Sequence, residues 1–239
     1  MSQIDTILKG QVCRVVDALD AALVESGRGR STITLVAVSK GHDAHRINQV
    51  LSVLDEYEYP YVLGENYVQE YEGKRSQIVS QKPVHMIGPL QSNKIRKALP
   101  LFNLIQSVHS TKILRLISQE AERIGCVFPI FIQVNVSADP NKSGWQVGEV
   151  EQLFNEIVPS CQGVVVQGLM TITENYEDSS GARDDFRALA RLRGALEHVG
   201  YHNLSLSMGM SQDFREAILE GATHVRIGTA LFGARGGSS

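Results

Sequence analysis

Short apolar runs alternate with helical patterns along most of this chain, and that alternation limits the possible folds more than any other feature. The runs contain four to eight residues each, and they are residues 33–40, 61–64, 84–88, 104–108, 129–136, 164–170, 204–207 and 224–227. The clearest helical patterns between them lie at 44–54, 110–124, 182–198 and 211–219, and one more helix precedes the first run. Strands and helices in alternation predict βα units and a parallel sheet.

The number of units distinguishes between two α/β folds. Eight βα units close a (β/α)8 barrel, the TIM barrel, and about 250 residues suffice for it as a single domain. A doubly wound open sheet is the alternative, and it would place a glycine-rich turn after its first strand. No G-x-G-x-x-G motif follows the first run, where Lys40 stands instead. We therefore expect one barrel domain over residues 1–239, with an extra N-terminal helix in 1–29 and the barrel in 33–235.

The composition excludes several classes of protein. With 43% hydrophobic residues and a formal charge of −3, the chain is ordinary globular protein without a bulk attraction to nucleic acid or anionic membranes. No apolar stretch reaches the ~18 residues of a membrane span, and the N-terminus lacks a signal-peptide pattern. Cys13, Cys126 and Cys161 form no C-x-x-C motif and have apolar neighbours, so we expect buried free thiols. Together these features predict a cytoplasmic protein.

Polar residues follow the apolar runs, and the carboxyl ends of barrel strands are where functional groups gather. Lys40 comes at the end of the first run, which is mostly apolar. Partial burial favours the neutral form of a lysine amine, and a neutral amine can form a Schiff base. The simpler alternative is a lysine whose side chain extends past the strand end into solvent.

The ends of the last two runs resemble a phosphate site. Ser211 precedes a helical pattern at 212–219 and is predicted to cap that helix, while Gly209 and Gly228 would let a ligand approach the main chain. Thr229 adds a hydroxyl beside Gly228. In many barrels the loops after strands 7 and 8 bind phosphate, although ordinary turn chemistry explains the same residue types. Together with Lys40, these loops predict a phosphorylated carbonyl ligand.

Arg226 lies between Val225 and Ile227 near the end of the last run. Because side chains alternate along a strand, Arg226 points away from the side on which these two apolar residues lie, and so toward the barrel mouth. A buried guanidinium needs partners. A structural salt bridge is therefore the alternative to a ligand-binding role.

Seven motifs follow one another between residue 33 and residue 235. They are residues 38–40 (VSK), 64–70 (GENYVQE), 85–94 (HMIGPLQSNK), 142–144 (KSG), 168–170 (GLM), 207–213 (SMGMSQD) and 225–233 (VRIGTALFG). In type and order they closely resemble the motifs of the pyridoxal phosphate homeostasis protein family (the YggS/PROSC family).

This resemblance implies a fold and a set of cofactor-binding residues. The fold is similar to the N-terminal barrel domain of alanine racemase, with an added N-terminal helix. Lys40 resembles the lysine that holds pyridoxal 5′-phosphate (PLP) as an internal aldimine, and Arg226 the residue that faces the pyridine nitrogen. Asn66 matches a position beside the cofactor, and Lys94 a lysine near the site with a less defined role. The positions that match the phosphate-binding residues are Met210, Ser211, Gly228 and Thr229.

The resemblance also implies a function in intracellular PLP (vitamin B6) homeostasis without robust catalytic turnover. We accordingly expect no catalytic residues and no metal. The expected partners are PLP and, by transient transfer, apo forms of PLP enzymes, whereas nucleic acid and membranes are not expected. We expect the protein to be a monomer.

Two other functions would use the same residues: a racemase-like PLP enzyme acting on amino acids, and a lysine-dependent aldolase acting on a sugar phosphate. Alanine racemases add a C-terminal β-domain, and the sequence ends at Ser239, shortly after the last run, which leaves no residues for such a domain. Arg226 argues for weak carbanion stabilisation, because a guanidinium cannot accept the pyridinium proton that makes the ring a strong electron sink. Racemases tolerate such an arginine, so it disfavours transamination and decarboxylation and does not by itself decide against a racemase. We therefore favour the homeostasis function.

Overall fold

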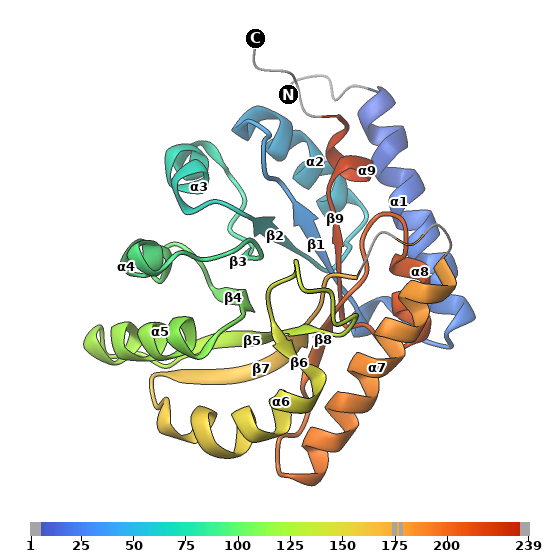
Figure 1. The fold of residues 1–239 in the computed structure, drawn as a ribbon. Helices are drawn as coiled ribbons and strands as arrows, with labels where there is room; N and C mark the ends of the chain where they lie inside the picture. The colour runs from blue at the N-terminus through green and yellow to red at the C-terminus, as the bar shows by residue number, and fades with distance from the viewer. Residues whose placement is uncertain (1–5, 174–175, 177–178, 235–239) are drawn as a thin grey trace.

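The predicted apolar runs form eight parallel strands, and these strands close into a barrel (Figure 1). The barrel strands are β1 (Thr34–Val38), β2 (Tyr61–Glu65), β3 (Val84–Met86), β4 (Leu104–Val108), β5 (Phe128–Asn135), β7 (Val164–Met170), β8 (Ser205–Ser207) and β9 (His224–Ile227). The ring is closed because β1 pairs with β9 and β4 pairs with β5. A two-residue strand, β6 (Trp145–Gln146), pairs with the end of β5. The computed structural model, which describes residues 6–173, 176 and 179–234, thus confirms the predicted TIM barrel.

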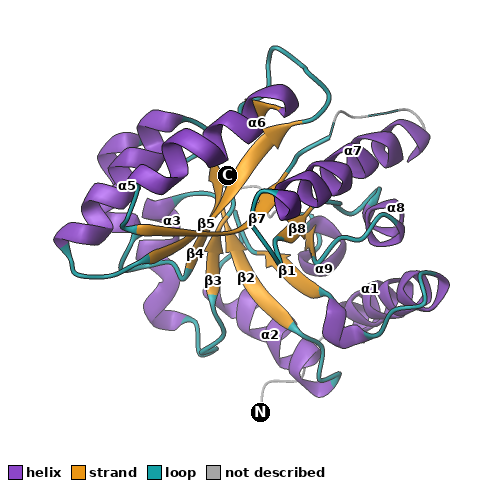
Figure 2. Ribbon diagram, turned by 90° about the horizontal axis from the view of Figure 1, so that it is seen from below, coloured by secondary structure: helices purple, strands orange, loops and turns teal. Residues whose placement is uncertain are grey.

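Helices surround the strands on the outer face of the barrel (Figure 2). They are α1 (Thr6–Glu25), α2 (Ala44–Glu56), α3 (Val68–Lys74), α4 (Ile95–Ala98), α5 (Thr111–Arg123), α6 (Val147–Gln152), α7 (Ser179–His198), α8 (Phe214–Leu219) and α9 (Thr229–Phe232). Side chains define where two of them begin: Asp43 accepts the Arg46 N–H at the start of α2, and Ser110 accepts the Ile113 N–H at the start of α5. Short 3-10 or π turns lie at Arg30–Thr32, Arg75–Gln77, Ser92–Lys94, Leu153–Ile157 and Val158–Ser160.

The predicted extra N-terminal helix is α1, which packs against α8 and α9. Its buried side chains recur at helical spacing, so one apolar face covers this part of the barrel. Arg28, just after α1, donates hydrogen bonds to the carbonyl oxygens of Ile218 (3.2 Å) and Ala222 (2.7 Å). The helix is therefore fixed beside the segments that follow β8 and β9.

Alternation along the strands separates the apolar side chains into an outer core and an interior. Leu35, Val225 and Ile227 belong to the large outer core, which lies between the barrel and its helices. Two smaller clusters belong to the alternate strand positions, and they contain Val36, Val62 and Ile87, and Leu104, Phe131 and Met170. Other alternate positions of the strands carry polar side chains, which lead to the candidate site.

The prediction of buried thiols is correct for one cysteine and wrong for another. All three are free, but Cys161 is buried, Cys13 is half-buried and Cys126 is exposed. Cys126 follows the end of α5, where its apolar neighbours Ile124 and Val127 are themselves exposed. Apolar neighbours in sequence therefore did not indicate burial at this turn. In the described part of the chain, no helix combines the length and the apolar character needed to cross a membrane.

Candidate functional site

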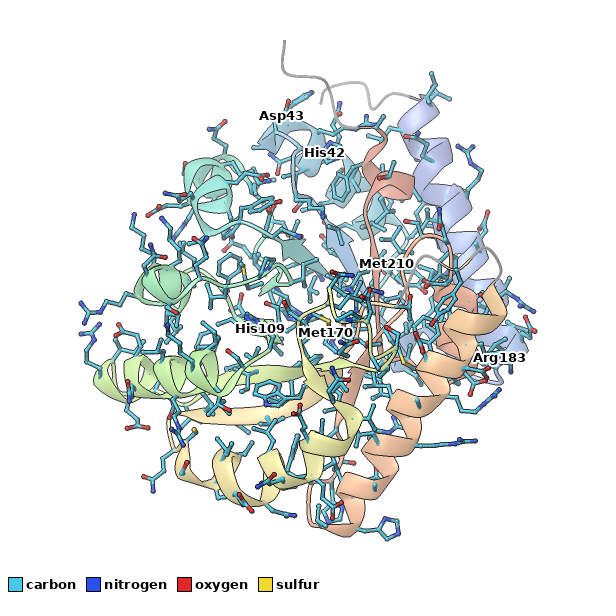
Figure 3. All side chains as sticks on the ribbon, viewed as in Figure 1. His42, Asp43, His109, Met170, Arg183 and Met210 are labelled. Carbon is cyan, nitrogen blue, oxygen red and sulfur yellow. The ribbon has the colours of Figure 1, made fainter. Side chains whose placement is uncertain are left out.

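The predicted site residues lie at or near the carboxyl ends of four adjacent strands, and therefore on one rim of the barrel. Around the ring, β2, β1, β9 and β8 are followed by Asn66, Lys40, Gly228 with Thr229, and Met210 with Ser211. In Figure 3 the labelled side chains of Met210, Met170 and His109 lie over the middle of the barrel. The structure thus brings together residues that are up to about 190 positions apart in the sequence.

Lys40 is half-buried in the turn that follows β1. Val36 and Val38 of β1 belong to an interior cluster. Asn66 directly follows β2, and its Oδ1 atom is buried with no hydrogen-bond donor among the described groups. An orphaned acceptor at this rim is typical of a site that a ligand completes.

Lys94 lies near this rim as well. It ends a 3-10 turn and, together with Asn66, Tyr67 and Leu90, lines a cavity of about 220 Å³. The structure therefore places Lys94 and Asn66 at the same cavity.

The loop after β8 differs from the prediction for Ser211. Helix α8 begins at Phe214, so Ser211 does not cap it. The carboxylate of Asp213 accepts the Met210 N–H (2.6 Å), and the amides of Asp213 and Phe214 donate to the Met210 carbonyl (3.1 and 2.9 Å). Asp213 thus closes the turn that Ser211 was expected to organise, because a carboxylate is the stronger acceptor.

This turn leaves Ser211 as an exposed residue whose hydroxyl has no hydrogen-bond partner among the described residues. Thr229, at the start of α9, is exposed too. Gly209 adopts a φ of +91°, and a Cβ there would lie 2.5 Å from the Cβ of Ala217, so only glycine fits. Two hydroxyls are consequently available at this rim, whereas the Met210 amide is already occupied.

Arg226 points into the barrel, as alternation predicted. Its side chain is buried and donates to the Ser207 hydroxyl (2.8 Å) and to the Thr171 carbonyl oxygen (2.6 Å). Among the described residues, no carboxylate lies within 4 Å of the guanidinium, and its printed partners are a hydroxyl and a carbonyl oxygen. Burial lowers the pKa of the guanidinium to about 10, and the charge of Asp213 opposes that shift.

A chain of hydrogen bonds continues from Arg226 across the barrel interior. Ser207 donates to Oε1 of Gln106 (2.6 Å), and Nε2 of Gln106 donates to Nδ1 of His85 (2.9 Å). The direction of every bond is fixed because a guanidinium can only donate. His85 therefore accepts at Nδ1 and carries its proton on Nε2.

Two interior histidines are held in the neutral form. Burial and the nearby His224 lower the pKa of His85 to about 3, and burial and Arg226 lower that of His224 to about 4. Their rings lie 6.0 Å apart, and the ring of Phe131 meets His224 edge-on at 5.3 Å. Of the described side chains near Arg226, these two imidazoles thus add no positive charge.

Sequence reasoning gave no role to His85, Gln106 or Ser207 in this chain. His85 and Ser207 lie in motifs that were recognised, and Gln106 interrupts the otherwise apolar start of its strand. The available signal was a polar residue at an alternate position of a barrel strand. The partners could not be identified, because they come from strands that meet only when the barrel closes.

The geometry can be compared with that of known proteins. The family model of the alanine racemase N-terminal domain matches residues 22–236. A pyridoxal phosphate homeostasis protein of Caenorhabditis elegans is 35% identical over 242 residues, which cover 96% of each chain. The structure of PipY of Synechococcus elongatus with PLP bound has a TM-score of 0.80 at 28% identity and covers 95% of this chain and 100% of that chain. An alanine racemase of Clostridium difficile shares the fold (TM-score 0.69, 16% identity, 93% of this chain and 56% of that chain).

The neutral state of His85 predicts that stability falls in acid. In the unfolded chain this histidine takes up a proton near pH 6.5, whereas in the folded barrel it resists protonation down to about pH 3. Its contribution is complete above pH 6.5 and is lost as the pH falls, by about 1.4 kcal/mol per pH unit for one proton. We expect the free energy of unfolding, measured with urea between pH 7 and 4.5, to depend less steeply on pH in His85→Gln than in the wild type. The exposed His202→Gln variant is the control, and an unchanged slope for His85→Gln would contradict the prediction.

Proposed function

Since the chain belongs to the pyridoxal phosphate homeostasis protein family, we propose that it binds PLP and acts in the intracellular homeostasis of this form of vitamin B6. The observation that carries the proposal is the rim itself, where Lys40, Arg226 and the hydroxyls of Ser211 and Thr229 come from adjacent strands or their following loops. The C. elegans relative bears that family's name, and the PipY structure has PLP bound.

The residues at the rim fit the chemical groups of PLP. Lys40 offers an amine for the aldehyde, and Ser211 and Thr229 offer hydroxyl donors for the phosphate. Asn66 offers a buried acceptor that has no donor among the described groups. The cofactor supplies an electrophilic aldehyde and a conjugated pyridine ring.

Lys40 would hold PLP covalently through its amine. It is half-buried after a largely apolar strand, and a lysine amine is the nucleophile that forms a Schiff base with an aldehyde. The hydroxyls at positions 211 and 229 would orient the phosphate from the adjacent loops. The covalent link is therefore formed at β1, and the anion is held after β8 and β9.

Arg226 would keep the bound cofactor unreactive. Its guanidinium stays charged at neutral pH, because even the lowered pKa of about 10 lies well above 7. Facing the pyridine nitrogen, it could donate but not accept a proton, and its charge would disfavour a protonated ring. A neutral ring is a weak electron sink, so we propose that the protein holds PLP without robust turnover.

We further propose that the protein passes PLP to apo enzymes by transient contact, and that it acts as a monomer in the cytoplasm. The three free cysteines support a reducing compartment. Racemase activity is less well supported, since the racemase neighbour shares only 16% identity with this chain.

The covalent link to Lys40 is tested by reduction and peptide mapping. Borohydride treatment of the PLP-loaded protein should place the pyridoxyl mass on the peptide that contains Lys40, one of eight lysines in the chain. Lys40→Ala should abolish the trapped mass, and Lys94→Ala should retain it. A pyridoxyl group on Lys94 or Lys142 in the wild type would refute the assignment.

The phosphate role of Ser211 and Thr229 is tested with two ligands. Replacing both residues by Ala should weaken binding of PLP by about tenfold or more, because hydrogen bonds to an anion are lost. Binding of pyridoxal, which has no phosphate, should change less than twofold. Ser31→Ala, at an exposed position before β1, is the control. An equal loss for both ligands would mean that the two residues only shape their turns.

The role of Arg226 is tested by comparing Arg226→Glu with Arg226→Gln. The carboxylate can stabilise a protonated ring nitrogen and the amide cannot, so the absorption of bound PLP should depend on pH differently in the two variants. Identical spectra and pH profiles would show that residue 226 does not address the ring nitrogen. Exchange of the Cα proton of an added amino acid for deuterium should be negligible in the wild type, and an enzyme-like rate would favour the racemase-like alternative.

A further inference from the structure

We propose that Lys74 is a positioning residue for Lys40: its ammonium, in an ion cluster with Glu65 and Glu70, fixes the turn that carries the reactive amine. The chemistry of this amine rests on the function proposed above. The geometry of the turn does not depend on it.

The ammonium of Lys74 holds the main chain on both sides of Lys40. Lys74 is the last residue of α3, and it is only 8% exposed. Its Nζ atom donates to the carbonyl oxygen of Ser39 (3.0 Å) and to that of His42 (3.2 Å). One buried cation therefore connects the first and last residues of the turn 39–42.

Two carboxylates complete the attachment of the same turn. Nζ of Lys74 lies 2.8 Å from Oε1 of Glu65 and 2.7 Å from Oε1 of Glu70. Oε1 of Glu65 also accepts from the Ser39 hydroxyl (2.6 Å), and Oε1 of Glu70 accepts from the Gly41 amide (2.7 Å). Each of the three charged groups thus binds at least one atom of residues 39–42.

Glu65 lies on the outer side of the strands. It follows Gly64 at the end of β2 and is fully buried beside Lys74, the last residue of α3. Gly41 has a φ of +74°. Because glycine adopts positive and negative φ values about equally readily, its own backbone preference does not fix the conformation of the turn. The ion cluster therefore supplies the constraint that the local sequence lacks.

A buried ion cluster contributes little net stability to a fold. Removing Lys74 and Glu65 from water carries a desolvation cost that offsets their attraction, and apolar residues of similar size often stabilise a fold as well. Oε2 of Glu65 is buried without a partner among the described groups, which adds to that cost. What the cluster provides is directional: four hydrogen bonds to a single turn.

The proposal is tested with Lys74→Met, which keeps the length of the side chain and removes the donor. Because Glu65 would then be an unpaired buried charge, the double variant Glu65→Gln/Lys74→Met is prepared as well. The rate at which added PLP becomes trappable by borohydride should fall at least tenfold in both. Lys97→Met is the matched control, since Lys97 forms an exposed ion pair with Glu72, and it should react at the wild-type rate.

The same substitutions in a Lys40→Ala background distinguish an effect on the position of Lys40 from an effect on the whole PLP site. If Lys74 acts through Lys40, PLP affinity in that background should be the same, within twofold, with and without Lys74→Met. If Lys74→Met lowered PLP affinity as much in the Lys40→Ala background as in the protein that retains Lys40, the proposal would be overturned, because the cluster would then support the whole site. Unchanged trapping rates in the Lys40-containing variants would overturn it too.

Hydrogen exchange of the PLP-free protein tests the geometry alone. Lys74→Met should accelerate exchange in the peptide that contains residues 39–42, with peptides around residues 209–211 and 226–229 unchanged. Exchange that is unaltered in the turn would refute the positioning role, whether or not PLP binds. If the wild type failed to bind PLP while the turn still loosened, the proposed function would fail and the structural role of Lys74 would stand.

Discussion

The pairing of the first barrel strand with the last is the constraint on which the candidate site depends. Val36 of β1 is in register with Arg226 of β9, and the strands remain adjacent up to their carboxyl ends. This pairing places the turn of Lys40 beside Gly228 and Thr229, although nearly the whole chain separates them. It also aligns Arg226 with the interior residue Val36, because inward positions alternate in step on paired strands.

The features that followed from the sequence were those that depend on periodicity. The alternation of runs predicted the eight strands, and the residue pattern around Arg226 predicted its inward direction. Partners that meet only through closure were not predictable: Gln106 comes from β4, Ser207 from β8 and Arg226 from β9. Gln106 and Ser207 are unremarkable polar residues in their own strands, and only the closed ring connects them with Arg226 in a single hydrogen-bonded chain.

The prediction for Ser211 failed because a nearby residue accepts the hydrogen bond that defines the turn. The role of Lys74 was not predicted because its partners are distant in the sequence. Ser211 has the residue type of a helix cap, but Asp213 captures the Met210 amide and moves the start of α8 to Phe214. Lys74 ends a short helix more than thirty residues after the turn that it holds. A sequence pattern gives no measure of which acceptor prevails in a turn, nor of which distant carbonyls an ammonium will reach.

The barrel wall also separates two kinds of electrostatic environment near Lys40. On the helix side, the carboxylates of Glu65 and Glu70 both pair with the ammonium of Lys74, and the three groups hold the turn. On the inner side, the guanidinium of Arg226 is bound by neutral groups, and Asp213, the carboxylate that raises its pKa, already accepts from the Met210 amide and the Thr173 hydroxyl. Among the described residues, carboxylates thus shape the scaffold around the lysine, while the printed hydrogen-bond acceptors of the arginine are neutral. This division bears on the proposed function, because a carboxylate at position 226 would stabilise positive charge on a bound pyridine ring and a guanidinium would not.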